Sequence, residues 1–349
     1  MRIEQLTFTR FVAAISIVIF HYGQNSILFN NQYVSFVFKQ ANVGVSYFFI
    51  LSGFVMIVAY QNENKINFAE FIKNRLARIY PVYILAIFII LGIKIFSDIN
   101  FKDLLLNILM IQSWVPGKAL TINNPGWSLS VELFFYSIFP FLVNKVYRKQ
   151  KLNNITIWIV LFWIISQILF QLITRNSIKI PYYEIKDVLY NPIMHLNEFL
   201  VGNLTGLFFI RKLGSKQNNY TPVIVLIIVT LLVLLKFPIG LNFHNGFLCL
   251  LFVPLILLIS LSNDKITKAF TTSNFVFLGE ISFGIYILQA PVWTIFSDYR
   301  LEKYFSIHKE SDSTISFLIR LIILIICSSL SYRYFEKPLR NKLKKNYIH

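Results

Sequence analysis

Residues 10–22 read RFVAAISIVIFHY, an apolar stretch with Arg10 at its start and His21 near its end. At about 3.6 residues per turn and 1.5 Å per residue, the pair is separated by about three turns, so both side chains lie on one helix face about 16.5 Å apart. Ionisable residues within a membrane span are costly and are functional candidates. The stretch therefore predicts a transmembrane helix that carries part of a site running through the membrane.

The composition of the whole chain indicates the same class of protein. Of 349 residues, 56% are hydrophobic and only 14% are charged, and the mean hydropathy is +0.61. A soluble domain carries about 25% charged residues. Uncharged apolar runs of about 20 residues recur, which is enough to cross a hydrocarbon core of about 30 Å. We expect an all-α, polytopic integral membrane bundle that forms a single domain over residues 1–349.

About ten transmembrane helices are predicted, and a basic tail follows them at 336–349. The predicted spans are 7–25, 43–61, 79–97, 128–145, 155–174, 189–210, 220–238, 246–262, 276–297 and 314–335. With the N-terminus inside, the inner segments hold roughly twice as many Lys and Arg residues as the outer loops, which places both termini in the cytoplasm. The net charge of +17 is explained by this asymmetry, so no nucleic-acid partner is expected.

Cysteine usage and the N-terminus add two further expectations. Cys249 and Cys327 both lie in apolar runs and give neither a metal-ligand spacing nor a disulfide framework, so no metal is expected. The N-terminal sequence leads into the first apolar run without a convincing cleavage site, which indicates a retained signal-anchor helix.

The predicted outer loop at 98–127 contains LLLNILMIQSW at 104–114, a run too short to span a bilayer. Irregular backbone at membrane depth is tolerated only against protein or a water-filled cavity. We expect a half-buried or re-entrant element. The small residues of VGVSYFFILSGF at 43–54 indicate close helix packing.

Arg75 and Arg78 precede Pro81 at the cytoplasmic edge of the third predicted span. Residues three apart share a helix face, and two guanidinium groups at this spacing can bind phosphate through forked donors. The alternative is ordinary positive-inside decoration.

Glu132 enters the fourth predicted span four residues after Ser128, a plausible helix N-cap. A carboxylate this deep needs a partner, and His21 at a similar depth is the expected one. An imidazole is a workable base near neutral pH, and a carboxylate fixes its tautomer. The alternatives are a buried structural histidine and a polar clamp between helices. Three further acids are expected to be members of structural ion pairs: Glu198, Glu280 and Glu336.

Six segments in order along the chain carry a resemblance to a known family. They are Arg10 with ten residues before His21, FFILSGF at 48–54, RLARIYP at 75–81, WSL at 127–129 with Glu132, LGEISFGIYIL at 278–288 and YFEKPLR at 334–340. Together they cover residues 5 to 340, and the chain resembles the membrane-bound acyltransferase-3 family, whose members O-acylate envelope glycans.

The resemblance implies a ten-helix bundle in which acyl-CoA enters from the cytoplasm and the acyl group passes to an acceptor hydroxyl at the outer side. It implies catalytic roles for Arg10, His21 and Glu132, and CoA-phosphate contacts from Arg75 and Arg78. Four residues in the matching segments are expected to support the site: Trp127, Ser128, Tyr286 and Glu336.

Two positions depart from the family pattern, and neither is given a role. Gln289 stands where members often have a histidine, and His195 where many have an arginine.

The sequence therefore predicts an O-acetyltransferase in the cytoplasmic membrane of a bacterium. Acetyl-CoA is its expected donor substrate, and no tightly bound cofactor is expected. The expected acceptor is a cell-surface polysaccharide or its lipid-linked precursor, and transfer is direct or proceeds through an acyl-His21 intermediate. The alternatives are a transporter or flippase of lipid-linked sugars and a structural subunit of an envelope-assembly complex. The oligomeric state is left open.

Overall fold

The computed structural model describes residues 3–93, 99–213, 218–308 and 312–345. Within these ranges the regular structure is helical, and a single isolated bridge joins Asn218 to Ser262. The predicted all-α class is thus confirmed.

The α-helices are α1 Gln5–Val18, α2 Ser35–Phe38, α3 Val43–Ala59, α4 Phe68–Ile93, α5 Phe101–Ile108, α6 Trp127–Phe141, α7 Leu152–Thr174, α8 Ile185–Tyr190, α9 Leu196–Phe208, α10 Thr221–Lys236, α11 Cys249–Leu261, α12 Lys265–Ala269, α13 Ser273–Ile295, α14 Asp298–Phe305, α15 Ser313–Ser331 and α16 Lys337–Lys345. Four helices continue as π-helical turns: α1 through Ile19–Gly23, α6 through Leu142–Tyr147, α9 through Phe209–Leu213 and α15 through Tyr332–Glu336. Two 3₁₀ turns, Gln112–Trp114 and Asn124–Gly126, precede α6.

Six helical segments of the described chain are long and apolar enough to cross a membrane. They are Gln5–Gly23, Phe68–Ile93, Asn124–Tyr147, Leu152–Thr174, Ser273–Ile295 and Ser313–Lys342. Three shorter apolar helices, α3, α10 and α11, have 13 to 17 residues. A multi-pass membrane protein is therefore supported, while ten crossings stay a prediction.

Two predicted spans differ from the structure in their boundaries. The segment 189–210 is broken, because Asn191 adopts an extended conformation before Pro192 and ends α8. Helix α4 begins at Phe68, so Arg75, Arg78 and Pro81 all lie within it. The end of the predicted span 79–97, from residue 94, lies outside the described residues, as do Arg2 and positions 346–349 of the predicted tail.

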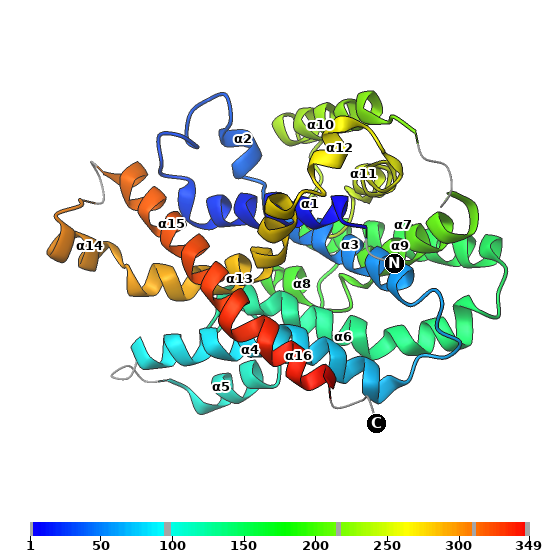
Figure 1. The fold of residues 1–349 in the computed structure, drawn as a ribbon, viewed down its shortest axis with the longest axis horizontal. Helices are drawn as coiled ribbons and strands as arrows, with labels where there is room; N and C mark the ends of the chain where they lie inside the picture. Colours follow the sequence, from blue (N-terminus) through cyan, green and yellow to red (C-terminus); the bar gives the residue numbers. More distant parts are fainter. Residues whose placement is uncertain (1–2, 94–98, 214–217, 309–311, 346–349) are drawn as a thin grey trace.

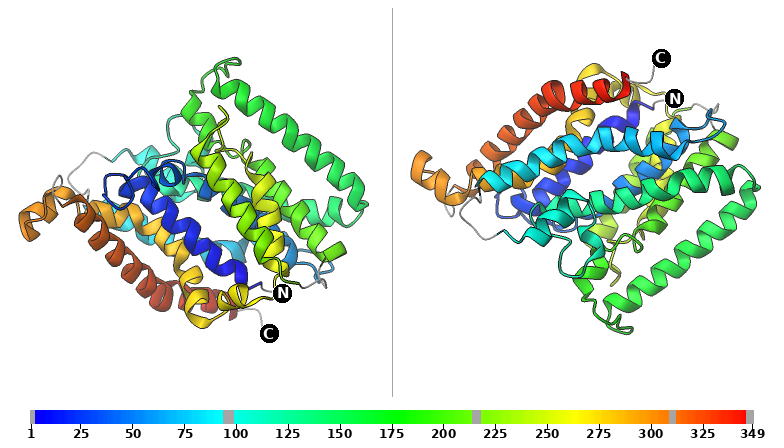
Figure 2. Two further views of the ribbon diagram at one scale, coloured as in Figure 1. Left: turned by 90° about the horizontal axis from the view of Figure 1, so that it is seen from above. Right: turned by 90° about the horizontal axis from the view of Figure 1, so that it is seen from below.

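The helices run mainly lengthwise through the bundle, and α1 lies near its centre (Figure 1). The start of α1 and the end of α16 lie on the side of the bundle away from α14, at the lower edge of the left view and the upper edge of the right view in Figure 2, whereas α14 lies at the left edge of all three views (Figures 1 and 2). We call the first the terminal end and the second the α14 end. Which of them faces the cytoplasm stays a prediction.

Two helix crossings are so close that only glycine fits. A Cβ added to Gly53 of α3 would lie 2.3 Å from the carbonyl oxygen of Phe199, and one on Gly202 of α9 would lie 2.1 Å from that of Ile50. A Cβ on Gly279 of α13 would lie 1.9 Å from the carbonyl oxygen of Thr7 in α1. The first crossing confirms the close packing expected of segment 43–54. The second holds α1 and α13 side by side.

Residues 99–126, which precede α6, fold against the protein, as expected for residues 104–114. Buried polar side chains fasten it: Gln112 Nε2 donates to the carbonyl oxygen of Gly126 at 2.8 Å, and Tyr83 Oη donates to that of Asn107 at 3.0 Å. Asn123 Nδ2 donates to the carbonyl oxygen of Ile287 in α13 at 3.3 Å. These bonds satisfy irregular backbone that has few partners of its own.

Candidate active site

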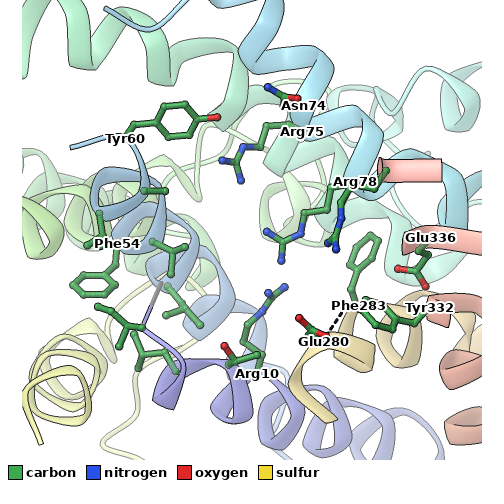
Figure 3. A pocket seen from close by; sticks show the side chains of 18 residues that line it. Arg10, Phe54, Tyr60, Asn74, Arg75, Arg78, Glu280, Phe283, Tyr332 and Glu336 are labelled. Atoms are coloured by element: carbon green, nitrogen blue, oxygen red, sulfur yellow. Dashed lines mark hydrogen bonds between the residues drawn. The ribbon is translucent and has the colours of Figure 1, made fainter. Parts of the chain in front are cut away.

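A cavity of about 450 Å³ lies among the terminal-end portions of α1, α3, α4, α13 and α15–α16. Its basic side chains are Arg10, Arg75, Arg78 and Arg340. The guanidinium groups of the first three point toward a common space in Figure 3. We call this space the arginine cavity.

Arg75 is held against two aromatic rings. Its guanidinium carbon lies 5.4 Å from the ring centre of Tyr60 and 5.2 Å from that of Phe71, within the range of a cation–π contact. Its Nε atom is buried without a hydrogen-bond partner among the described residues. Buried donors are normally paired, so this atom is available to donate to a bound ligand.

The acidic side chains of the arginine cavity are held by hydroxyl groups. Tyr332 Oη donates to Glu280 Oε2 at 2.5 Å, as drawn in Figure 3, and Ser331 Oγ donates to Glu336 Oε1 at 3.1 Å. Four arginines thus face two carboxylates. Like charges at short range repel each other in a medium of low dielectric, so an anionic ligand would stabilise the arrangement.

A second cavity, of about 30 Å³, adjoins the first, since Arg10 and Phe283 line both. Its polar lining includes Ser128, Glu132, Ser282 and Tyr286. We call it the Glu132 cavity. It brings three of the predicted site residues, Ser128, Glu132 and Tyr286, next to Arg10.

Two expectations about the start of α6 are wrong. Helix α6 begins at Trp127 with Gly126 as its N-cap, and the Ser128 hydroxyl donates to the carbonyl oxygen of Pro125 at 3.0 Å instead of capping the helix. Glu132 Oε2 accepts a hydrogen bond from Tyr136 Oη at 2.7 Å, not from His21. Tyr136 lies one helical turn further along α6, so a partner on the same helix takes the place expected for the imidazole.

His21 lies in the π-helical turn that continues α1, toward the α14 end, and its side chain is exposed. Its Nδ1 atom lies 2.8 Å from Oε1 of Gln289 in α13. The linings of the two cavities do not include it among the described residues. Arg10 and His21 nevertheless both face α13, as their common helix face predicts.

Trp127 belongs to a buried aromatic group and is not among the described residues that line the arginine cavity or the Glu132 cavity. Its ring centre lies 4.9 Å from that of Tyr190, 5.3 Å from that of His195 and 5.8 Å from that of His244. Trp127 is the first residue of α6, and its packing in this group holds the start of the helix in place.

His195 and Glu198 form a buried pair with Ser46. His195 Nδ1 lies 2.7 Å from Glu198 Oε2, its Nε2 donates to the carbonyl oxygen of Leu189 at 2.8 Å, and the Ser46 hydroxyl donates to Glu198 Oε1. The relative exposure of all three side chains is 1% or less. This Glu198 cluster confirms the structural ion pair expected of Glu198.

Comparison with known proteins identifies the family. Residues 3–333 match the family described as an acyltransferase domain, the acyltransferase-3 family. The chain belongs to this family. No solved structure matches.

Two of the proteins to which this chain is similar are named as acyltransferases. The O-acetyltransferase OatA of Staphylococcus aureus is 22% identical over 95% of this chain and 56% of its own length. The acyltransferase MdmB of Streptomyces mycarofaciens is 33% identical over 42% of this chain and 41% of its own length. An uncharacterized protein of Haemophilus influenzae is 31% identical over 46% of this chain and 73% of its own length. The chain spans about half the length of the first two relatives.

Three residues of the site lie in or directly beside the family segments but were given no role from the sequence. Arg340 and Tyr332 line the arginine cavity, and Gln289 contacts His21. Arg340 is the last residue of YFEKPLR, and it reaches the cavity because the predicted basic tail is helix α16, which packs on α4. Gln289 directly follows LGEISFGIYIL. The sequence signal available for Arg340 and Gln289 was therefore their position at the end of a family segment or directly after one.

Proposed function

We propose that this protein is an integral membrane O-acyltransferase that transfers acetyl from cytoplasmic acetyl-CoA to a hydroxyl of a cell-surface polysaccharide or its lipid-linked precursor. The observation that carries the proposal is the convergence of Arg10, Arg75 and Arg78 in one cavity. Family membership and the name of the OatA relative support the reaction class.

The arginine cavity suits the nucleotide part of CoA. Coenzyme A carries a pyrophosphate and a ribose phosphate, and guanidinium groups bind such oxygens through two parallel donors. The cavity volume falls within the range of about 300–1,000 Å³ that is usual for small-molecule sites. The Nε of Arg75, which has no hydrogen-bond partner among the described residues, and the Tyr60 ring beside it give this wall both a donor and a planar surface.

The remaining residues support a path from this cavity to the α14 end. The thioester arm would pass Arg10, which lines both cavities, and reach the polar lining formed by Ser128, Glu132 and Tyr286. The acceptor would enter at the α14 end, where His21 is exposed. With the terminal end in the cytoplasm of a bacterium, donor and acceptor approach from opposite faces of the inner membrane.

The proposed chemistry is a single displacement. The acceptor oxygen attacks the thioester carbonyl carbon, a new C–O bond forms, the C–S bond breaks and the CoA thiolate leaves. His21 takes the proton of the acceptor hydroxyl and returns it to the thiolate, so that charge and atoms balance. General base catalysis of this kind contributes about 10²–10⁴-fold, and the positioning of both substrates supplies much of the remainder.

The test compares surface glycans of the wild-type strain and a strain lacking the gene, by mass spectrometry and NMR. Loss of an ester mass and its return on complementation are expected. Complementation with His21→Ala should fail although the protein inserts normally, whereas the exposed His308→Ala should succeed. Full glycan acetylation in a well-expressed His21→Ala strain would contradict the mechanism.

Acyl-CoA turnover by the purified protein separates this proposal from the flippase alternative. Release of free thiol from acetyl-CoA in the presence of acceptor is expected of a transferase. A flippase of lipid-linked sugars would move its substrate without consuming the thioester.

A further inference from the structure

The amide of Gln289 is fixed by the backbone of its own helix. Gln289 Nε2 donates to the carbonyl oxygen of Tyr286 at 2.6 Å. A carbonyl oxygen only accepts hydrogen bonds, so the amide atom that faces it must be the NH₂ group. Turning the amide over would place two acceptor oxygens 2.6 Å apart. The side chain is 0% exposed, so water does not compensate for that arrangement.

This orientation decides which nitrogen of His21 carries hydrogen. With its NH₂ group on Tyr286, the amide presents Oε1 to His21 Nδ1 at 2.8 Å. The amide oxygen only accepts, so Nδ1 must donate. In a neutral imidazole the other nitrogen, Nε2, then holds the lone pair. The tautomer thus follows from a chain of two hydrogen bonds that ends on a backbone carbonyl.

Local packing holds both partners in place. His21 lies in the π-helical turn Ile19–Gly23, and such turns reorient side chains within a helix. The next residue, Tyr22, stacks on Trp293 of α13, with ring centres 4.3 Å apart and an interplanar angle of 19°. The turn is therefore fastened to α13 four residues beyond Gln289, while the imidazole stays exposed.

We propose that Gln289 is a positioning residue that holds His21 with its hydrogen on Nδ1, which makes Nε2 the nitrogen that takes the proton of the acceptor hydroxyl. The inference rests on the proposed function for the reaction, but the tautomer itself can be observed without turnover. A neutral amide would do here what a carboxylate does for a catalytic histidine elsewhere, without adding a charge.

The tautomer is tested by NMR of the full-length protein with ¹⁵N-labelled histidine at pH 8. The chain has five histidines, and the His21→Gln protein identifies the His21 signals by their loss. We expect a proton-bearing Nδ1 and an unprotonated Nε2 for His21. A proton-bearing Nε2 in the wild-type protein would overturn the inference.

The catalytic consequence is tested with two substitutions. Gln289→Leu removes the acceptor for Nδ1, and we expect kcat to fall about 10²-fold while the KM for acetyl-CoA stays within about twofold. Gln289→His should restore most of the rate, because a neutral imidazole also has one donor for Tyr286 and one acceptor for His21.

Gln171→Leu is the matched control. Like Gln289, Gln171 makes two hydrogen bonds through its amide, here both with the backbone of Asn242, and its loss should lower stability without changing kcat or the His21 signals. A Gln289→Leu protein with wild-type kcat and an unchanged His21 tautomer would contradict the proposal. If acyl-CoA turnover is absent but Nδ1 bears the proton, the proposed function fails and the tautomer assignment stands.

Discussion

The arginine cavity and the Glu198 cluster both hold charged side chains inside the helical bundle, but the partners of those charges differ. In the Glu198 cluster each carboxylate oxygen is bonded to a side chain of the protein, Ser46 or His195. In the arginine cavity the guanidinium groups repel one another, and Arg75 Nε is buried without a hydrogen-bond partner in the part of the chain that the structure describes. The comparison shows that the carboxylate of Glu198 is fully paired within the protein, whereas the clustered arginines leave a charge that a bound anion would balance.

The largest effect on stability is expected from Glu198→Ala. The substitution leaves His195 and Ser46 buried without their acceptor, and breaking a buried ion pair in this way costs about 3–5 kcal/mol. Thermal unfolding in detergent should show a much lower midpoint and little folded protein. Glu302→Ala, at an exposed carboxylate that pairs with His308, is the control. A Glu198→Ala midpoint equal to that of the wild type would show that the cluster is not structural.

A different response is expected from Arg75→Gln and Arg78→Gln. On the proposed function each removes a hydrogen bond to a phosphate of CoA, which is worth about 1.5–3 kcal/mol and corresponds to a rise in KM for acetyl-CoA of about 10–100-fold. The unfolding midpoint should stay the same or rise, because a like charge is removed. Lys149→Gln, at an exposed position, should change neither quantity. Unchanged KM values would show that phosphate binds elsewhere.

The pH dependence of stability offers a finer test at His244, which packs against His195 of the Glu198 cluster. Burial, followed by the charge of His195, lowers the pKa of His244 from 6.5 to about 3. The unfolded state then binds the extra proton, so this contribution is complete above pH 6.5 and is lost as the pH falls below it, by about 1.4 kcal/mol per pH unit.

The unfolding midpoint of His244→Gln should therefore change less with pH than that of the wild type between pH 6.5 and 5. The amide can still accept the hydrogen bond that Asn42 Nδ2 donates to His244 Nδ1 at 3.2 Å. Exposed His308→Gln should follow the wild-type slope. If the unfolding midpoints of His244→Gln and the wild type change equally with pH, His244 is not responsible for the pH dependence.

The smallest effect is expected at the surface pair of Lys186 and Glu184. Its atoms lie 2.8 Å apart, but the side chains are 65% and 71% exposed, and solvent screens such pairs. Lys186→Ala should leave the unfolding midpoint within experimental error. A measurable fall would mean that charge pairing stabilises this protein without burial.

The sequence predicted the helical class and the shared position of Arg75 and Arg78, because both depend on local spacing. Hydrophobic runs mark helices, and residues three apart share a face, which is how Arg75 and Arg78 come to line one cavity. Helix ends were less predictable. The start of α4 at Phe68 lies in a polar stretch that hydropathy excludes.

Long-range partners could not be derived from spacing. Similar depth suggested that Glu132 faces His21, but depth does not fix the direction in which a side chain points around its helix, and Tyr136 is the observed partner. Gln289 was passed over because glutamine has no charge to mark it. Its importance lies in two contacts, with His21 and Tyr286, that appear only once α1 packs on α13.

Helix α16 has a consequence for biosynthesis. Because Arg340 lines the arginine cavity and α16 packs on α4, a wall of that cavity comes from the last tenth of the chain. The ribosome must synthesise residue 340 before the cavity is enclosed, so a nascent chain that has already inserted its first helices still lacks a complete arginine cavity. Chains terminated before residue 340 would lack this wall of the cavity and, on the proposed function, the ability to hold the donor.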